Sequence, residues 1–468
     1  MKSHSRILRV LLVMILASAA IFSADAKKPQ RVKYVFFMIG DGMGINQVYS
    51  TNLYNSALGI TDEPVNFSVF PVKSIITTHC TNTLVTDSAA GGTALATGIK
   101  TTEGTIGLDA DGKPIQTLCE AAKAAGYGAG VVSSVSVDHA TPGSFYAHTT
   151  YRYNYNDISG QLIKSDIDFA AGGGFDYEGD KPYRTSDFIS EARNAGIGVY
   201  VGKEQIKAGI DHSRRAILLG SDSVNELPLA IDRTDDWVSL ADFTGAAIEH
   251  LYANYENGFF LMVEGGRIDH SAHNDDAASN FREVNDFAES VDLVLDFCSK
   301  HPGEAVVLVT SDHDTGGLMM GAGKYEMHPE LLAGQTCSKN QLSATIEGLK
   351  NSGREVSWEE IKSLLKKSLG LWTVVPVDEK QEARFKKLYE DVFVTRDGEQ
   401  EVNWYAANSM LVAEAVNYLD RAAGFAYSFS SHSGSPVGLY VSGARAAEFA
   451  GCGDNTDISK VVRKIAKY

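Results

Sequence analysis

Carboxylate side chains follow three apolar runs of this chain. The runs and the acids that come after them are 34–39 with Asp41, 259–263 with Glu264, and 306–309 with Asp312. Apolar runs of this length are typical of buried parallel strands, whose carboxyl ends meet at one edge of a sheet. Carboxylates gathered at such an edge repel one another unless a cation lies between them. The pattern therefore predicts a metal site, because three such acids are hard to explain as ordinary loop polarity.

Histidines stand beside these acids at spacings that suit a metal ion. Asp269 and His273 lie four residues apart, so on a helical turn they share one face and can chelate a single ion. Asp312 is followed directly by His313 at a predicted strand end. A solvated acidic loop is the ordinary alternative for either pair alone. Both pairs together with Asp41 favour a metal centre.

Ser88 offers a nucleophile at the predicted start of a helix. Mostly small residues follow it as far as Gly98, and they let other groups approach closely. Unpaired N–H groups and the helix dipole at such a start favour an anion. The ordinary alternative is a serine that only caps the helix. The hydroxyl becomes a nucleophile where a base or a metal takes its proton.

The elements that must position these residues alternate between strand and helix from residue 33 to about 315. Further strands are expected near 72–78, 129–133 and 216–219, and helices near 115–125, 241–255 and 283–300. Such alternation predicts an α/β fold with a large, mostly parallel central sheet sandwiched by helices.

This alternation stops after Gly317. The segment 318–425 is richer in Lys, Glu and helical patterning, which predicts a helical insertion in one domain. Ser357 and Glu360 form a predicted capping box, and Gly370 ends that helix. Two more helices are expected at 379–391 and about 405–422, followed by a strand at 437–441. The insertion is expected to roof the site, form a dimer contact, or do neither.

The N-terminus has the pattern of a secretory signal peptide. Positive residues precede an apolar stretch from Val10 to Phe22, and Ala24-Asp25-Ala26 is a small-x-small cleavage pattern. We therefore expect residues 1–26 to be removed near Ala26. The mature chain 27–468 is expected to be soluble and periplasmic or secreted. No other stretch is long and apolar enough to span a membrane.

Charge and cysteine content limit the possible partners. The formal charge of −17 argues against a nucleic-acid surface or an anionic membrane. An anionic substrate would then need local positive charge at its site. The five cysteines show neither a disulfide framework nor a metal knuckle, and sequence cannot pair them. Cys119 and Cys298 fall in apolar helical patterns, which predicts buried, inert thiols.

Five motifs span most of the mature chain. They are Gly40-Asp-Gly-Met-Gly44, Thr86-Asp-Ser-Ala-Ala90, Glu264-x4-Asp269-x3-His273, Asp312-His313 and His432-Ser-Gly434. They resemble the motifs of the alkaline phosphatase family and occur in the family's order. The resemblance implies an alkaline phosphatase-like fold, hydrolysis of phosphate monoesters and a possible homodimer.

The resemblance also implies a role for each matching residue. Ser88 matches the serine that becomes phosphorylated, and Arg152 matches the arginine that grips two phosphate oxygens. The matching ligand sets are Asp269, His273 and His432 for one zinc, Asp41, Asp312 and His313 for a second zinc, and Asp41, Thr141 and Glu264 for magnesium. Mixed imidazole and carboxylate ligands suit zinc, and oxygen ligands suit magnesium.

Two histidines leave the third ion open. His139 and His270 stand where well-known bacterial members of the family carry aspartate and lysine, and they resemble the animal enzymes and some other bacterial ones. Loss of a carboxylate beside the third site should loosen magnesium. His270 is expected to contact phosphate through water or to tune its neighbours. His148 and His301 receive no role.

The expected function is an exported phosphomonoesterase that works through a phosphoserine. A phosphodiesterase of the same superfamily is the nearest rival, although Arg152 favours monoesters. A sulfatase would need a Cys or Ser-x-Pro-x-Arg site, which Ser88-Ala-Ala-Gly91 lacks. A metal-dependent phosphate-binding protein without turnover is the alternative from another class. Broad specificity and an alkaline pH optimum follow from the expected mechanism.

Overall fold

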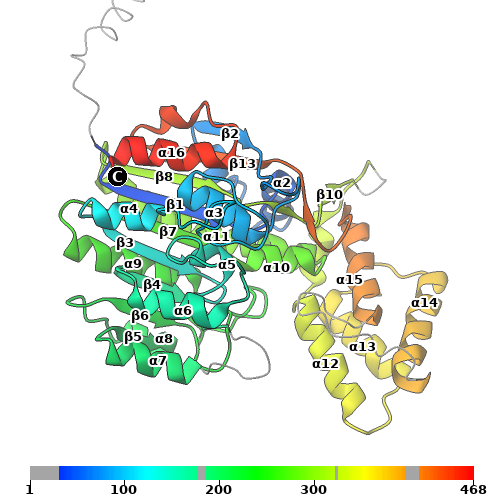
Figure 1. Ribbon diagram of the computed structural model, residues 1–468. Helices are drawn as coiled ribbons and strands as arrows, with labels where there is room; N and C mark the ends of the chain where they lie inside the picture. The colour runs from blue at the N-terminus through cyan, green and yellow to red at the C-terminus, as the bar shows by residue number, and fades with distance from the viewer. Residues whose placement is uncertain (1–30, 177–184, 322–324, 396–409) are drawn as a thin grey trace, which may run out of the picture. The chain divides into compact units, whose positions relative to one another are not determined.

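A nine-stranded sheet organises the part of the chain that the computed structural model describes, residues 31–176, 185–321, 325–395 and 410–468 (Figure 1). In spatial order its strands are β2 (Val72–Ile76), β13 (Val437–Gly443), β8 (Ala305–Thr310), β1 (Tyr34–Gly40), β7 (Phe259–Gly265), β3 (Gly128–Ser133), β4 (Phe169–Gly172), β6 (Ala216–Leu219) and β5 (Gly198–Val201). Among these nine strands, β13 alone runs in the opposite direction to the other eight. The expected large, mostly parallel sheet is confirmed. The predicted signal peptide 1–26 lies outside the described residues.

The central strands are apolar on both sides because helices cover both faces of the sheet. Along β1, Val35, Phe37 and Ile39 belong to one buried cluster, and the alternate residues belong to the other. Helices α4 (Leu118–Ala124), α6 (Tyr155–Lys164) and α16 (Asn455–Ala466) contribute to the first cluster. Helices α9 (Leu240–Asn254) and α11 (Ala277–Lys300) contribute to the second. Alternate residues of each strand therefore contribute to different cores, one on each face of the sheet.

Strand register brings the carboxylates to one edge. Ile39 of β1 pairs with Glu264 of β7 on one side and with Thr310 of β8 on the other. Asp41 lies two residues beyond Ile39, and Asp312 lies two residues beyond Thr310. Parallel strands in register therefore bring Asp41 and Asp312 to the same level, with Glu264 two residues before it.

Shorter elements complete this edge. They are α2 (Ile45–Ala57), α3 (Ser88–Thr97), α5 (Ala140–Gly143), α10 (Arg267–His273), and the strand pairs β9 (Asp314–Thr315) with β12 (His432–Ser433) and β10 (Met319–Met320) with β11 (Phe425–Ala426). In the sequence, helix α7 (Thr185–Asn194) precedes β5 and helix α8 (Gly202–Lys207) follows it.

All five cysteines are free thiols, with Cys119 buried and Cys298 partly buried. Within the described ranges, no helix has the length and apolarity that a membrane crossing requires.

A helical region follows β10 and has a core of its own. It contains η2 (Pro329–Gly334), α12 (Lys339–Asn351), α13 (Trp358–Leu369), α14 (Glu379–Glu390), the π-helical turn η3 (Asp391–Thr395) and α15 (Met410–Ala423). Its apolar side chains pack together and against Tyr54 of α2 and Phe281 of α11. Because β10 pairs with β11, the chain leaves and returns at the same place (Figure 1). The residues 405–409 of the predicted third helix lie outside the described residues.

Only half of the predicted capping box at α13 is present. The Ser357 side chain accepts a hydrogen bond from the Glu360 N–H at 3.3 Å, as expected for an N-cap. The Glu360 carboxylate instead binds the Arg354 guanidinium, which is charged and therefore a better partner than a backbone N–H. Gly370 ends the helix in the left-handed conformation, with φ +67°.

Candidate active site

The first group of metal-ligand side chains lies where β1 and β8 end. The Nε2 atom of His313 is 3.5 Å from an oxygen of Asp41 and 3.4 Å from an oxygen of Asp312. All three side chains are fully buried. On its other side, the Nδ1 atom of His313 is 3.2 Å from the Thr315 hydroxyl, which fixes the ring so that Nε2 faces the carboxylates.

A second group joins α10 to β12. Asp269 and His273 share one face of α10, with 3.3 Å between carboxylate and Nε2, as their spacing predicted. The pairing of β12 with β9 brings His432 to them, with its Nε2 atom 3.1 Å from Nε2 of His273. The Nδ1 atoms of the two rings each lie 3.0 Å from a backbone carbonyl, of Ser430 for His273 and of Thr86 for His432. Both Nε2 atoms therefore face the Asp269 carboxylate.

A third group surrounds the other side of Asp41. Single ligand atoms of Asp41, His139 and Glu264 lie within 4.8 Å of one another, as do those of each of the two groups above. Thr141 of α5 is fully buried, and its hydroxyl makes no hydrogen bond within the described residues. The Ser133 hydroxyl donates to the second oxygen of Glu264 and holds that side chain in place.

These carboxylates are buried together at a high electrostatic cost. Burial and the charges around it raise the pKa of Glu264 to about 8, and burial with the charge of Asp269 raises the pKa of Asp312 to about 7. Burial and neighbouring acids also hold the pKa of Asp41 well above its usual range. A cation among them would remove that cost.

The donor atoms themselves fit metal ions. Both oxygens of Asp41, one oxygen of Asp312 and one of Glu264 are buried without a hydrogen bond in the described structure. Buried polar atoms are rarely left so, unless a ligand completes them. The first two groups combine imidazole and carboxylate, which suits zinc, and the third combines two carboxylates and an imidazole with the nearby Thr141 hydroxyl. The described residues therefore fit a metal centre with three neighbouring positions.

The second group would release a proton when it binds an ion. Burial alone would lower the pKa of His273, but the Asp269 carboxylate raises it to about 9. The same contact holds the pKa of Asp269 well below its ordinary value, although burial opposes this shift. A metal ion would replace the imidazolium proton as the partner of Asp269.

Ser88 is the first residue of α3 and does not cap it. The cap is Asp87, whose carboxylate accepts hydrogen bonds from the N–H groups of Ala89 and Ala90. The alternative of an N-cap serine is therefore wrong, because the acid before it takes that place. The Ser88 hydroxyl lies 3.2 Å from Nε2 of His313, and the side chain is buried.

The small residues of α3 allow this close approach. A Cβ atom on Gly91 would lie 3.0 Å from the backbone oxygen of Asp312, and one on Gly92 would lie 3.0 Å from the Ser144 hydroxyl. Larger side chains would push the helix away from the edge of the sheet. The nucleophile and the first ligand group would then separate.

Arg152 lies against Asp87 and His139. Its guanidinium is 3.0 Å from the Asp87 carboxylate and 3.3 Å from Nε2 of His139. Burial would raise the pKa of Asp87, but the Arg152 charge and backbone N–H groups lower it. The buried ion pair thus holds the arginine beside Ser88.

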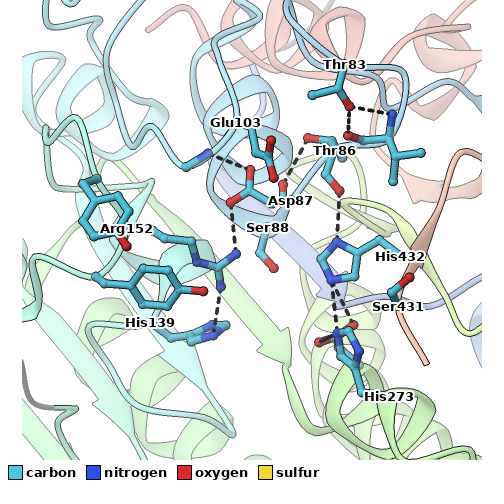
Figure 2. Close-up of a pocket in the computed structure, with 15 residues that line it drawn as sticks. Thr83, Thr86, Asp87, Ser88, Glu103, His139, Arg152, His273, Ser431 and His432 are labelled. Atoms are coloured by element: carbon cyan, nitrogen blue, oxygen red, sulfur yellow. Dashed lines mark hydrogen bonds and ion pairs between the residues drawn. The ribbon is translucent and has the colours of Figure 1, made fainter. Parts of the chain in front are cut away.

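Ser88, Arg152 and the second ligand group face a pocket of about 570 Å³. In Figure 2, Ser88 lies between Arg152 and His139 on one side and His432 and His273 on the other. The pocket is lined by Thr83, Val85, Thr86, Asp87, Ser88, Glu103, Gly104, His139, Tyr151, Arg152, Tyr153, Asp269, His273, Ser431 and His432. No described residue of 318–425 is among them.

The structure brings the predicted site residues into this one region, although His270 contacts His139 and does not line the pocket. Its Nδ1 atom is 3.0 Å from Glu226 and 3.0 Å from the Arg267 guanidinium. Its ring meets that of His139 edge-on, with centroids 5.8 Å apart. Burial, followed by the Arg267 charge, lowers the pKa of His270 to about 3. His270 is not a lining residue of the pocket.

The two histidines that received no role have structural partners. His148 lies between the Gly107 carbonyl, at 2.7 Å, and the Glu120 carboxylate, at 2.9 Å. His301 stacks on Phe297, with ring centroids 4.1 Å apart.

Sequence reasoning missed several supporting residues. Asp87 had a visible signal, because an acid directly before a predicted helix is a common N-cap. Glu226, Thr315 and Ser133 had none, since each meets its partner only through the fold. A Cβ at Gly42, where φ is +63°, would come within 2.6 Å of Asp269 and of Thr315, so the turn after β1 needs glycine.

Comparisons with known proteins agree with this geometry. A sequence model of the family described as "Alkaline phosphatase" matches residues 32–468. The chain is 30% identical over 467 residues to alkaline phosphatase 4 of Bacillus subtilis (strain 168), which covers 95% of this chain and 91% of that protein. It is 28% identical over 347 residues to the alkaline phosphatase of Escherichia coli (strain K12), covering 63% of this chain and 72% of that one. The crystal structure of a cold-active alkaline phosphatase from Shewanella sp. superposes with a TM-score of 0.78 at 28% identity, over 92% of this chain and 99% of that one.

Proposed function

Since this chain belongs to the alkaline phosphatase family, we propose that it hydrolyses phosphate monoesters through a phosphoserine at Ser88. One observation carries the proposal. The Ser88 hydroxyl stands at the start of α3, 3.2 Å from His313 and next to the Asp87–Arg152 ion pair. A nucleophile and a guanidinium thus face the same pocket.

The reaction divides into two displacements at phosphorus. In the first, Arg152 binds two phosphoryl oxygens, the Ser88 oxygen bonds to phosphorus, and the bond to the alcohol oxygen breaks. The alcohol leaves with a proton, and the phosphoryl group stays on Ser88. In the second, the oxygen of a water molecule bonds to phosphorus and the bond to Ser88 breaks. Inorganic phosphate leaves, and Ser88 regains its proton.

Three ions would occupy the ligand groups in this proposal. Asp269, His273 and His432 would hold one zinc, and Asp41, Asp312 and His313 a second. Bound there, zinc would supply Lewis acidity that makes an alkoxide of a serine at neutral to alkaline pH and stabilises the leaving oxygen. The positive charge would also draw an anionic ester to a protein whose formal charge is −17.

The third group would take magnesium through Asp41, Glu264 and Thr141. His139 brings a nitrogen where a carboxylate would bind magnesium more tightly, so another divalent ion can compete. His270 would act on this group through His139, which its ring touches, rather than by contact with phosphate.

The pocket favours monoesters over diesters. A monoester phosphoryl group presents three unesterified oxygens, of which Arg152 would bind two while the serine attacks phosphorus. A diester replaces one of them with a second alkoxy group, which would lie against the Arg152 side. The proposal also includes removal of residues 1–26, export to the periplasm or medium, and a homodimer.

Hydrolysis of p-nitrophenyl phosphate between pH 7 and 10 tests the proposal, with protein loaded with zinc and magnesium. Wild type should turn over and gain one phosphate on the Ser88 peptide, as read by mass spectrometry after an acid quench. Ser88→Ala should lose nearly all turnover and the label. Ser290→Ala is a matched control, because Ser290 is buried in α11 away from the pocket.

Two results would reject the proposal. Turnover of bis-p-nitrophenyl phosphate in the absence of monoester turnover would indicate a diesterase. Tight phosphate binding without release of any alcohol would indicate a binding protein.

A further inference from the structure

Two tyrosines flank the arginine that we place on the phosphate. Tyr151 and Tyr153 both line the pocket, and their side chains are 54% and 41% exposed. Exposed aromatic rings are ordinary when scattered over a surface, but these two lie together at the mouth of a reaction pocket. A ring in that place has apolar area that a substrate can cover.

The rings are held in place before any substrate arrives. Tyr151 and Tyr153 meet edge-to-face with centroids 5.2 Å apart, and Tyr153 meets Tyr155 in the same way at 6.0 Å. Tyr155 is buried at the start of α6 and holds one end of this tyrosine row, Tyr151, Tyr153 and Tyr155. The Asn154 N–H donates to the Tyr151 carbonyl at 3.0 Å, which closes the turn between them. Binding to preformed rings costs little conformational entropy.

The tyrosine row begins one side chain away from the phosphate position. The Arg152 guanidinium lies 5.5 Å from the centre of the Tyr153 ring and 3.0 Å from Asp87, the neighbour of Ser88. None of the three metal-ligand groups includes a residue of this row. With the phosphoryl group on Ser88 and Arg152, the row would be left to contact the alcohol part of a bound ester.

We infer that Tyr151 and Tyr153 bind an aromatic ring in the leaving group, and that nucleoside 5′-monophosphates are a preferred substrate class. The inference rests on the proposed function and names its substrate. A nucleobase offers a π-face for stacking on tyrosine. Glu103, an exposed carboxylate in the same pocket, accepts hydrogen bonds from the amino groups of a base.

A cationic alcohol such as choline fits this row less well. Quaternary ammonium groups bind to open aromatic faces. Here the guanidinium of Arg152 already lies by the Tyr153 ring, and its charge would repel a second cation. A neutral planar ring meets no such repulsion.

Adenosine 5′-monophosphate and ribose 5-phosphate test the inference, since both release a primary 5′-alcohol and differ in the base. We expect kcat/KM for the nucleotide to be higher by about fivefold or more, the size of one stacking contact. Tyr151→Ala should bring the ratio close to one, and Tyr151→Phe should preserve it. Tyr49→Ala should leave the ratio unchanged, because Tyr49 is equally exposed at 54% but lies on α2 outside the pocket.

Other outcomes would overturn the inference. Equal kcat/KM values for the two esters would show that the aromatic contact is not made. A ratio of the two kcat/KM values that is unchanged in Tyr151→Ala would show the same. Faster hydrolysis of phosphocholine than of the nucleotide would assign the row to a cation. Failure of the proposed function reads differently, because then neither ester would be hydrolysed. In that case the affinities of both esters for zinc-loaded Ser88→Ala protein, measured by calorimetry, still test the inference. A contact to the base requires tighter binding of the nucleotide than of ribose 5-phosphate.

Discussion

The carboxyl edge of the sheet and the helical region 329–423 are both well buried, but with opposite kinds of side chain. At the edge, Asp41, Glu264 and Asp312 are fully buried and keep oxygen atoms that make no hydrogen bond in the described structure. In the helical region the buried side chains are mainly Leu, Ile, Val, Ala and Phe, for example Leu365 and Phe385.

This difference separates the places where activity and stability arise. Burying an unpaired carboxylate costs several kcal/mol of folding free energy, so favourable contacts elsewhere in the protein must offset the cost of the edge. Burying a leucine stabilises the fold by roughly 2 kcal/mol. Changes at the edge should therefore remove activity without unfolding the protein, and changes in the helical core should do the reverse.

Removal of metal ions should have the largest effect. Exhaustive chelation should reduce phosphatase activity to background and lower the unfolding temperature, because the carboxylates then repel one another. Zinc followed by magnesium should restore both. Activity and thermal unfolding, followed with metal content, measure this. Full activity in protein shown to contain no metal would contradict it.

Asp312→Asn tests the repulsion among the edge carboxylates at a single residue. The variant should lose zinc and activity, yet its metal-free form should unfold at a higher temperature than metal-free wild type, because one buried charge has gone. A metal-free variant less stable than metal-free wild type would show that Asp312 has a structural role instead.

Loss of the guanidinium should be the next largest effect. Arg152→Ala removes the group that we place on two phosphoryl oxygens, and kcat/KM for a monoester should fall by about 10² to 10³. Activity toward a diester should change much less. Arg384→Ala is the control in the other region, where an exposed guanidinium pairs with Glu414 and should be dispensable. Equal losses on both esters would place Arg152 outside phosphate recognition.

Much of this comparison could be predicted from the sequence, because both regions have local signals. Apolar runs located β1, β7 and β8, and the spacing of Asp269 and His273 placed them on one face of α10. The capping serine and the final glycine set the limits of α13. These features depend on residues close in the sequence.

Contacts between distant segments could not be predicted in this way. The Asp87–Arg152 ion pair joins residues 65 apart, and Glu226 reaches His270 from a loop. His432 was placed by family resemblance, since the two-residue pairing of β12 with β9 leaves no pattern in the sequence. The antiparallel direction of β13 likewise has no signal in its own residues.

A cavity in the helical core should act on stability alone. Leu365→Ala deletes a fully buried side chain and should lower the free energy of unfolding by about 2–5 kcal/mol. Activity at a temperature where the variant is folded should remain, since no described residue of this region lines the pocket. Denaturant unfolding and assays at low temperature measure the two effects. Lys366→Ala, at the next and exposed position, is the control. Loss of activity in folded Leu365→Ala protein would break the separation of the two regions.

The smallest effect concerns acid stability. Burial, with the charge of nearby His212, lowers the pKa of His250 to about 4, from about 6.5 when unfolded. The unfolded chain therefore binds a proton that the folded chain rejects, and stability should fall as pH drops from about 6.5 to 4. In metal-free protein the carboxylates at the sheet edge have the opposite effect on stability as pH falls. Its carboxyl pKa values near 7 to 8 let the folded state take up protons first, so they favour folding as pH falls.

The two effects oppose each other between about pH 4 and 6.5, and above pH 6.5 the carboxylates act without His250. Relative to metal-free wild type, His250→Gln should therefore gain stability as pH falls from about 6.5 to 4, and both proteins should lose stability alike as pH rises above 7; thermal unfolding from pH 4 to 9 would measure both. A stability difference between the two proteins that does not change from pH 6.5 to 4 would exclude His250 as the group responsible. Equal stability of wild type at pH 6.5 and 9 would mean that the carboxylates at the sheet edge do not repel one another.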